Sequence, residues 1–124
     1  MPETTPRTQP RQDHERLDVY NVALEFAVWR HRLKMPKGNA DLVDQLNRAT
    51  TSVVLNVAEG AGEFSKAEKQ RFYRMARRSA AECAAALDIL EAGGGMTAEV
   101  LEPGRELLSR VVAMLTKLLP RENG

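Results

Sequence analysis

The stretch from Ser52 to Glu68, SVVLNVAEGAGEFSKAE, contains two glycines followed by a serine and resembles a phosphate-binding loop in composition. Such loops bind phosphate because glycine exposes backbone amides at a helix N-terminus, where the helix dipole favours anions. Here Gly60 and Gly62 follow a helical pattern, so they lie at a helix C-terminus. The stretch also lacks the preceding strand and the Gly-Lys-Ser/Thr ending of a Walker loop. We therefore predict a turn between two helices, with Gly60 in the left-handed position just past the first.

The residues after this turn, SKAE, have the spacing of a capping box. We expect the Ser65 hydroxyl to accept a hydrogen bond from the amide of Glu68, and the Glu68 carboxylate to accept one from the amide of Ser65. Anion binding at Ser65 is the alternative.

Seven polar side chains lie on or beside the apolar stripes of the two helices that this turn joins. They are Gln45, Arg48, Ser52, Asn56, Glu59, Ser79 and Glu82. A buried polar group without a partner destabilises a fold by roughly 1–3 kcal/mol, so these side chains should contact one another. An antiparallel hairpin would bring Arg48 close enough to Glu82 for an ion pair. The set is either a polar network that fixes helix register or a small pocket for a ligand or a partner's side chain.

No set of residues has the spacing of a catalytic or metal site. Bundles often hold metals through Glu-x-x-His pairs, but His14 lies in the N-terminal segment and His31 has no Glu three residues before it. Cys83 resembles a small core residue. We therefore predict no catalytic residue, no metal and no cofactor, and hence a protein that is not an enzyme.

Positive charge is concentrated on one helical segment. Residues 1–81 contain 14 Lys and Arg against 10 Asp and Glu, whereas residues 82–124 contain 4 against 7. The cations that share one broad face of this segment are Lys66, Arg71, Arg74, Arg77 and Arg78. Such a face is usually only solvated, but this density also suits RNA or another polyanion. Tyr73 lies near this face and could stack on a base.

Four segments must position these residues. Apolar residues recur at helical spacing in 17–33, 40–59, 66–92 and from about 97 to 119, and no alternating strand pattern is present. This pattern predicts an all-α, antiparallel up-down-up-down four-helix bundle.

Several residues mark where these helices begin, end or bend. We expect Asn39 to cap the second helix and the GGG run after residue 92 to end the third. Pro103 should kink the fourth helix or begin it afresh. The apolar stripe predicted for the third helix is Phe72, Met75, Ala76, Cys83, Ala86 and Leu90.

The first helical segment has more apolar surface than one bundle can bury. One side consists of Val19, Val22, Phe26, Trp29 and Leu33. A second side consists of Tyr20, Ala23, Leu24, Ala27 and Val28. A bundle helix needs one such stripe, so the second predicts self-association.

The whole chain has 124 residues, 43% hydrophobic and 28% charged, with a net charge of +1, which fits one globular domain. We expect a disordered tail over 1–14, the bundle over 15–120 and a short tail over 121–124. Cys83 is the single cysteine, no apolar run approaches the length of a membrane span, and the N-terminus lacks a signal-peptide pattern. These features predict a cytoplasmic protein without membrane contact.

The segment QLNRATTSVVLNVAEGAGEFS, followed by RFYRMARRSAAECAAAL, closely resembles the four-helix-bundle family of 23S rRNA intervening-sequence proteins. The most specific matches are the seven polar residues named above together with Gly60, Gly62, Phe72 and Ala76. The resemblance implies a cytosolic bundle that assembles into a pentameric ring and has no catalytic activity. The family is also similar to accessory proteins of diversity-generating retroelements, which implies RNA or a nucleic-acid-handling protein as a partner.

Overall fold

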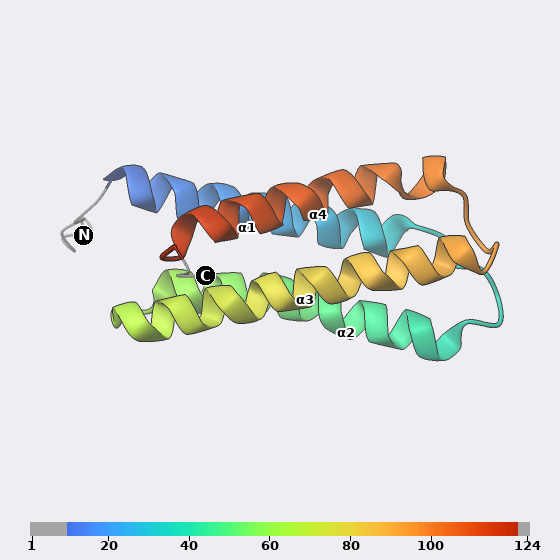
Figure 1. The fold of residues 1–124 in the computed structure, drawn as a ribbon, viewed down its shortest axis with the longest axis horizontal. Helices are drawn as coiled ribbons and strands as arrows, with labels where there is room; N and C mark the ends of the chain where they lie inside the picture. The colour runs from blue at the N-terminus through green and yellow to red at the C-terminus, as the bar shows by residue number, and fades with distance from the viewer. Residues whose placement is uncertain (1–9, 122–124) are drawn as a thin grey trace, which may run out of the picture.

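The computed structural model describes residues 10–121, with side chains described from residue 15 onward. The chain forms four helices, α1 (Pro10–Arg32), α2 (Ala40–Gly62), α3 (Lys66–Ala92) and α4 (Ala98–Leu118). Successive helices run in opposite directions (Figure 1), as the sequence pattern predicts. The predicted tails over 1–9 and 122–124 lie outside the described residues. None of the described helices has the length and apolarity needed to cross a bilayer.

The first helix begins earlier than predicted, because residues 10–14 are helical where a tail is expected. Pro10 is the first helical residue, a position at which the missing amide hydrogen of proline removes no hydrogen bond. Pro10 therefore does not prevent residues 10–16 from being helical, although the sequence predicts a helix only from residue 17.

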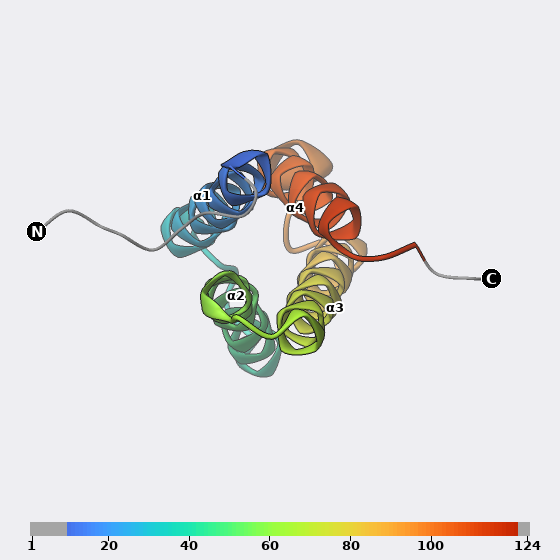
Figure 2. The same ribbon diagram turned by 90° about the vertical axis from the view of Figure 1, so that its left-hand side faces the viewer.

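The helices surround a common axis, and each packs against two neighbours (Figure 2). Helices α1 and α3 lie diagonally across the bundle, as do α2 and α4. The fully buried side chains of largest volume come from all four helices and include Tyr73, Phe26, Leu46, Leu87, Leu101 and Leu115. All four helices therefore contribute side chains to one hydrophobic core.

The buried face of α3 differs from the predicted stripe. Its interior residues follow the alternating three- and four-residue spacing of a heptad, in the order Tyr73, Ala76, Ala80, Cys83, Leu87 and Leu90. Phe72 is only half-buried and Met75 is 40% exposed, so the prediction that they form the core was wrong. The other members of the predicted stripe are buried as predicted, namely Ala76, Cys83, Ala86 and Leu90, and the first buried residue of the helix is Tyr73.

The end of α2 also differs from the prediction, since the helix continues through Gly60 to Gly62. Gly60 does not have a positive φ. A β-carbon built at Gly60 would lie 2.6 Å from the Tyr73 ring, so glycine permits the close approach of two helices here. Left-handed glycines lie in the other two loops: Gly38 has φ +88°, and Gly94, within the predicted GGG terminator, has φ +80°.

The predicted starts of α2, α3 and α4 were correct in position, but the predicted capping bonds were only partly correct. The Ser65 hydroxyl accepts from the amide of Glu68 at 3.3 Å, as expected. Asn39 lies at the start of α2 without a capping bond from its side chain, which donates to the Lys37 carbonyl instead. Thr97 caps α4 by accepting from the amide of Val100, a bond the sequence analysis did not predict.

Helix α4 is continuous across Pro103, so the predicted fresh start at this residue was wrong. The next residue, Gly104, lies against the Trp29 ring of α1, and a β-carbon there would be 2.3 Å from it. On the other side of α4, Arg105 bonds to Asp88 at 2.8 Å and to Glu91 at 2.7 Å. These contacts fix α4 against both of its neighbours.

Candidate functional site

Part of the predicted polar network forms a chain of hydrogen bonds between α2 and α3. The hydroxyl oxygens of Ser52 and Ser79 are 2.7 Å apart. The side-chain amide of Asn56 donates to both the hydroxyl and the carbonyl of Ser52 at 2.9 Å. These three side chains therefore bond to one another, and the bond between Ser52 and Ser79 connects α2 to α3.

Beside these hydrogen bonds, α2 and α3 form the walls of an open groove of about 500 Å³, which we call the α2–α3 groove. Its lining residues are Leu42, Gln45, Arg48, Ala49, Ser52, Glu82, Ala85, Ala86 and Ile89. A more open hollow on α2, which shares Arg48 and Ser52 with the groove, extends it toward Leu55 and Asn56. The groove thus combines small side chains, two opposite charges and an exposed apolar residue, Ile89.

The remaining members of the predicted network behave differently. Gln45, Arg48 and Glu82 all line the α2–α3 groove. Within the described part of the chain, however, no salt bridge joins Arg48 to Glu82, so the expected ion pair is not formed. Glu59 is exposed and lines neither hollow. The structure therefore brings five of the seven predicted residues to the two hollows, and the buried Ser79 is joined to them by its bond to Ser52.

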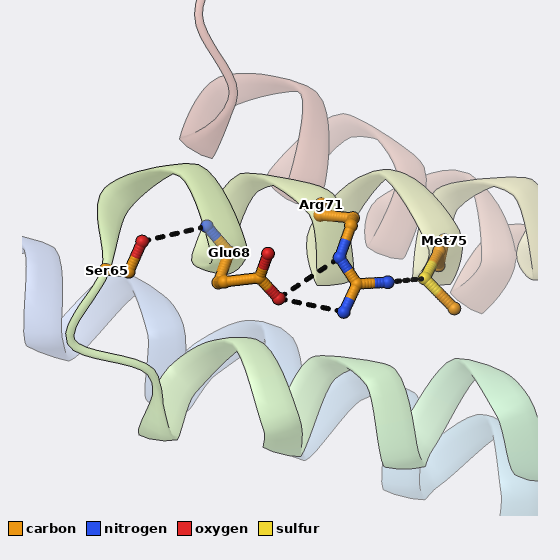
Figure 3. Close-up of polar contacts among 4 residues, drawn as sticks. All are labelled: Ser65, Glu68, Arg71 and Met75. Atoms are coloured by element: carbon orange, nitrogen blue, oxygen red, sulfur yellow. Dashed lines mark hydrogen bonds and ion pairs between the residues drawn. The ribbon is translucent and has the colours of Figure 1, made fainter.

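Within the predicted basic face, some cations bond to other side chains of the protein and others do not. The guanidinium of Arg71 bonds to Glu68 at 2.8 Å and contacts the Met75 sulfur (Figure 3). It also lies 4.6 Å from the centre of the Phe72 ring. The bond from Arg71 lowers the pKa of Glu68. In the described residues the Glu68 carboxylate bonds to Arg71 and not to the amide of Ser65, so the predicted capping box is only half formed. Arg77 donates to the hydroxyl of Thr116 on α4.

The other three cations, Lys66, Arg74 and Arg78, are exposed on α3. Among the described residues, no hydrogen bond or ion pair holds them. Their charges are available to an external anion, whereas those of Arg71 and Arg77 are partly engaged within the chain.

Tyr73 is not available to a base, contrary to the prediction. Its side chain is 1% exposed, and its hydroxyl has no hydrogen-bond partner in the described structure. Burial raises the pKa of Tyr73 to about 12. The prediction failed because Tyr73 occupies a heptad core position, rotated away from the neighbouring arginines.

The fold also shifts the pKa of two further titratable groups, Cys83 and Lys69. Burial raises the pKa of Cys83 to about 11, so its thiol remains protonated at neutral pH. Lys69 donates to the Gly60 carbonyl at 2.8 Å, and burial, followed by the charge of Arg16, lowers the pKa of Lys69. Lys69 thus caps the C-terminus of α2, a role the sequence analysis missed.

Metal ligands do not gather in the described region, where no three His, Cys, Asp or Glu side chains lie close enough to hold an ion.

An apolar stripe remains on the outer side of α1. Leu17, Leu24 and Val28 are 55%, 37% and 45% exposed, and their spacing places them on one face of the helix, opposite Val19 and Phe26. We call these three residues the outer stripe. The predicted excess of apolar surface on this helix is therefore present, although it is narrower than expected because Ala23 is buried and Tyr20 is half-buried.

Residues 15–117 match a family model described as 23S rRNA-intervening sequence protein. Among solved structures, the chain is similar to a protein of unknown function from the S23 ribosomal protein family of Bacteroides thetaiotaomicron. The two share 23% sequence identity and a TM-score of 0.74, over 83% of this chain and 99% of the other. This similarity supports the fold described above. No curated protein matches the chain.

Proposed function

Since the chain belongs to the 23S rRNA-intervening sequence protein family, we propose that it is a non-enzymatic, self-associating binding module of the cytoplasm. The observation that carries this proposal is the outer stripe of α1, where three large apolar side chains are exposed in one line. Full burial of such a side chain contributes roughly 1.5–3 kcal/mol, so covering the exposed part of each would contribute about half of that. The resemblance to the intervening-sequence family supports an assembly of five subunits.

A pair of lysines in the outer stripe tests self-association. Leu24→Lys with Val28→Lys should shift the assembly toward monomer and raise its dissociation constant by about 100-fold or more, because two charges replace buried apolar area. The matched control is Ser109→Lys with Ala113→Lys, which adds the same charges at the same spacing on exposed positions of α4. Light scattering after size-exclusion chromatography measures the mass. A wild-type chain that stays monomeric at high concentration would contradict the proposal.

The unengaged cations Lys66, Arg74 and Arg78 support binding of RNA as the task of the assembled module. Phosphate contacts from several copies add together, so an assembly would bind a polyanion more tightly than a single chain. The near-neutral net charge of +1 favours a weak, salt-sensitive interaction.

Charge reversal on α3 tests RNA binding. Arg74→Glu with Arg78→Glu should abolish binding of a fluorescent single-stranded RNA at low salt, measured by anisotropy. Lys34→Glu with Lys37→Glu, which changes the same charge at exposed positions outside α3, is the matched control and should retain binding. If both variants bind the RNA with equal affinity, the RNA-binding proposal is wrong and a protein remains as the proposed partner of the module.

A small-ligand pocket at Ser52, Asn56 and Glu82 is less well supported, because Ser52 and Asn56 already bond each other and Ser52 bonds Ser79.

A further inference from the structure

The outer stripe of α1 needs an acceptor surface, and the α2–α3 groove has the form of one. We propose that the outer stripe of one copy lies in the α2–α3 groove of a second copy. This inference rests on the self-association proposed above and specifies which surfaces meet.

Shape is the first argument for this pairing. Ala49, Ala85 and Ala86 line the groove, and such small side chains allow the backbone of another helix to approach closely. Ile89 is 57% exposed at the same site and supplies apolar area at the edge of the groove. Another helix with an apolar ridge would cover both features at once.

Length is the second argument. At 1.5 Å per residue, the outer stripe from Leu17 to Val28 extends about 16 Å along α1. The α2 wall of the groove, from Leu42 to Ser52, extends about 15 Å by the same measure. The ridge and the groove therefore match along the helix axis.

Charge is the third argument. Glu25 and Arg32 are exposed on α1 beside the outer stripe, while Arg48 and Glu82 line the groove. None of these four side chains has an ion-pair partner in the portion of the chain that is described. Each surface thus offers one unpaired cation and one unpaired anion to the other, so two ion pairs can form when the stripe lies in the groove.

The positions of the two surfaces define the type of interface. Helix α1 lies diagonally opposite α3 (Figure 2), so the outer side of α1 and the groove face different directions. A contact between them is heterologous, and each copy keeps one free surface for a further neighbour. Two outer stripes facing each other would instead bring two ridges together and leave the grooves uncovered.

Mixing two complementary variants tests this arrangement. The stripe variant carries Leu24→Lys and Val28→Lys, and the groove variant carries Ala85→Lys and Ile89→Lys, all at exposed positions. Each variant alone should be monomeric. A mixture should form a 1:1 heterodimer that grows no further, because the intact groove of the first variant accepts the intact stripe of the second. Native mass spectrometry measures the composition, and circular dichroism checks that both variants retain their helices.

Other outcomes separate the two proposals. A groove variant that assembles like the wild type, while the stripe variant dissociates, would overturn the pairing and leave self-association standing. A monomeric wild type would overturn both. If the double lysine variant of the groove loses helicity, Ile89→Ser alone should still raise the dissociation constant at least tenfold, and an unchanged constant would overturn the pairing.

Discussion

At the scale of single residues, the contact between Gly60 and Tyr73 determines how closely α2 and α3 approach. We predict that Gly60→Ala destabilises the protein by about 1–3 kcal/mol, since its β-carbon would overlap the buried ring. Gly62→Ala is the matched control, because nothing lies within 4 Å of a β-carbon there. It should be neutral or stabilising by up to about 1 kcal/mol. Urea denaturation of both variants measures the difference, and equal effects would show that the close contact is unimportant.

Two buried acidic groups predict a loss of stability at alkaline pH. The pKa of Cys83 is raised from 9.0 to about 11 and that of Tyr73 from 10.0 to about 12. Above pH 9 the folded chain therefore holds protons that the unfolded chain releases, so the free energy of unfolding falls as pH rises from 9 to 12. Each group should contribute on the order of 2 kcal/mol to this loss.

Tyr73→Phe tests the tyrosine contribution. The variant should match or exceed wild-type stability at pH 8, because the removed hydroxyl has no described partner, and it should lose less stability between pH 10 and 12. Denaturation curves at several pH values provide the measurement. An alkaline loss identical to that of the wild type would contradict the assigned role.

Residue chemistry was only partly predictable from the sequence. That Ser52 and Ser79 belong to one polar network follows from their places beside facing stripes, but their direct bond to each other does not. The environment of Tyr73 does not, because a rotation of one residue separates a core position from an exposed one. The free charges of Arg48 and Glu82 were also not predictable, since an ion pair depends on side-chain geometry within the groove.

At the scale of elements, the helix starts differ in how firmly they are capped. Ser65 accepts a hydrogen bond from the amide of Glu68, whereas Asn39 makes no such bond. We therefore predict that Ser65→Ala destabilises the protein by about 1 kcal/mol and that Asn39→Ala has a smaller effect. Thermal denaturation ranks the two variants. A larger loss at Asn39 would mean that its side chain caps α2 in solution.

The number and order of helices were predictable because apolar residues recur at helical spacing over four long segments. Their ends were less predictable. Helix α2 continues through Gly60 because packing against Tyr73 outweighs the tendency of glycine to end a helix. Similarly, α4 continues across Pro103, where packing on α1 and α3 supports the helix on both sides.

At the scale of the whole molecule, self-association should make thermal stability depend on concentration. A chain whose outer stripe is covered in the assembly unfolds with dissociation, so its Tm should rise with protein concentration. The stripe variant, Leu24→Lys with Val28→Lys, should show a constant Tm. Scanning calorimetry over a hundredfold range of concentration measures both. A constant Tm for the wild type would count against assembly.

The architecture also affects how the chain folds during synthesis. Helices α1 and α4 lie side by side although they are the first and last to be made, and Trp29 of α1 packs on Gly104 of α4. As the nascent chain leaves the ribosome, α1, α2 and α3 can assemble first, but one flank of α1 stays open to water until α4 emerges. The bundle is therefore completed only after α4 has been made, and a chain truncated before α4 would expose this flank to chaperones and proteases.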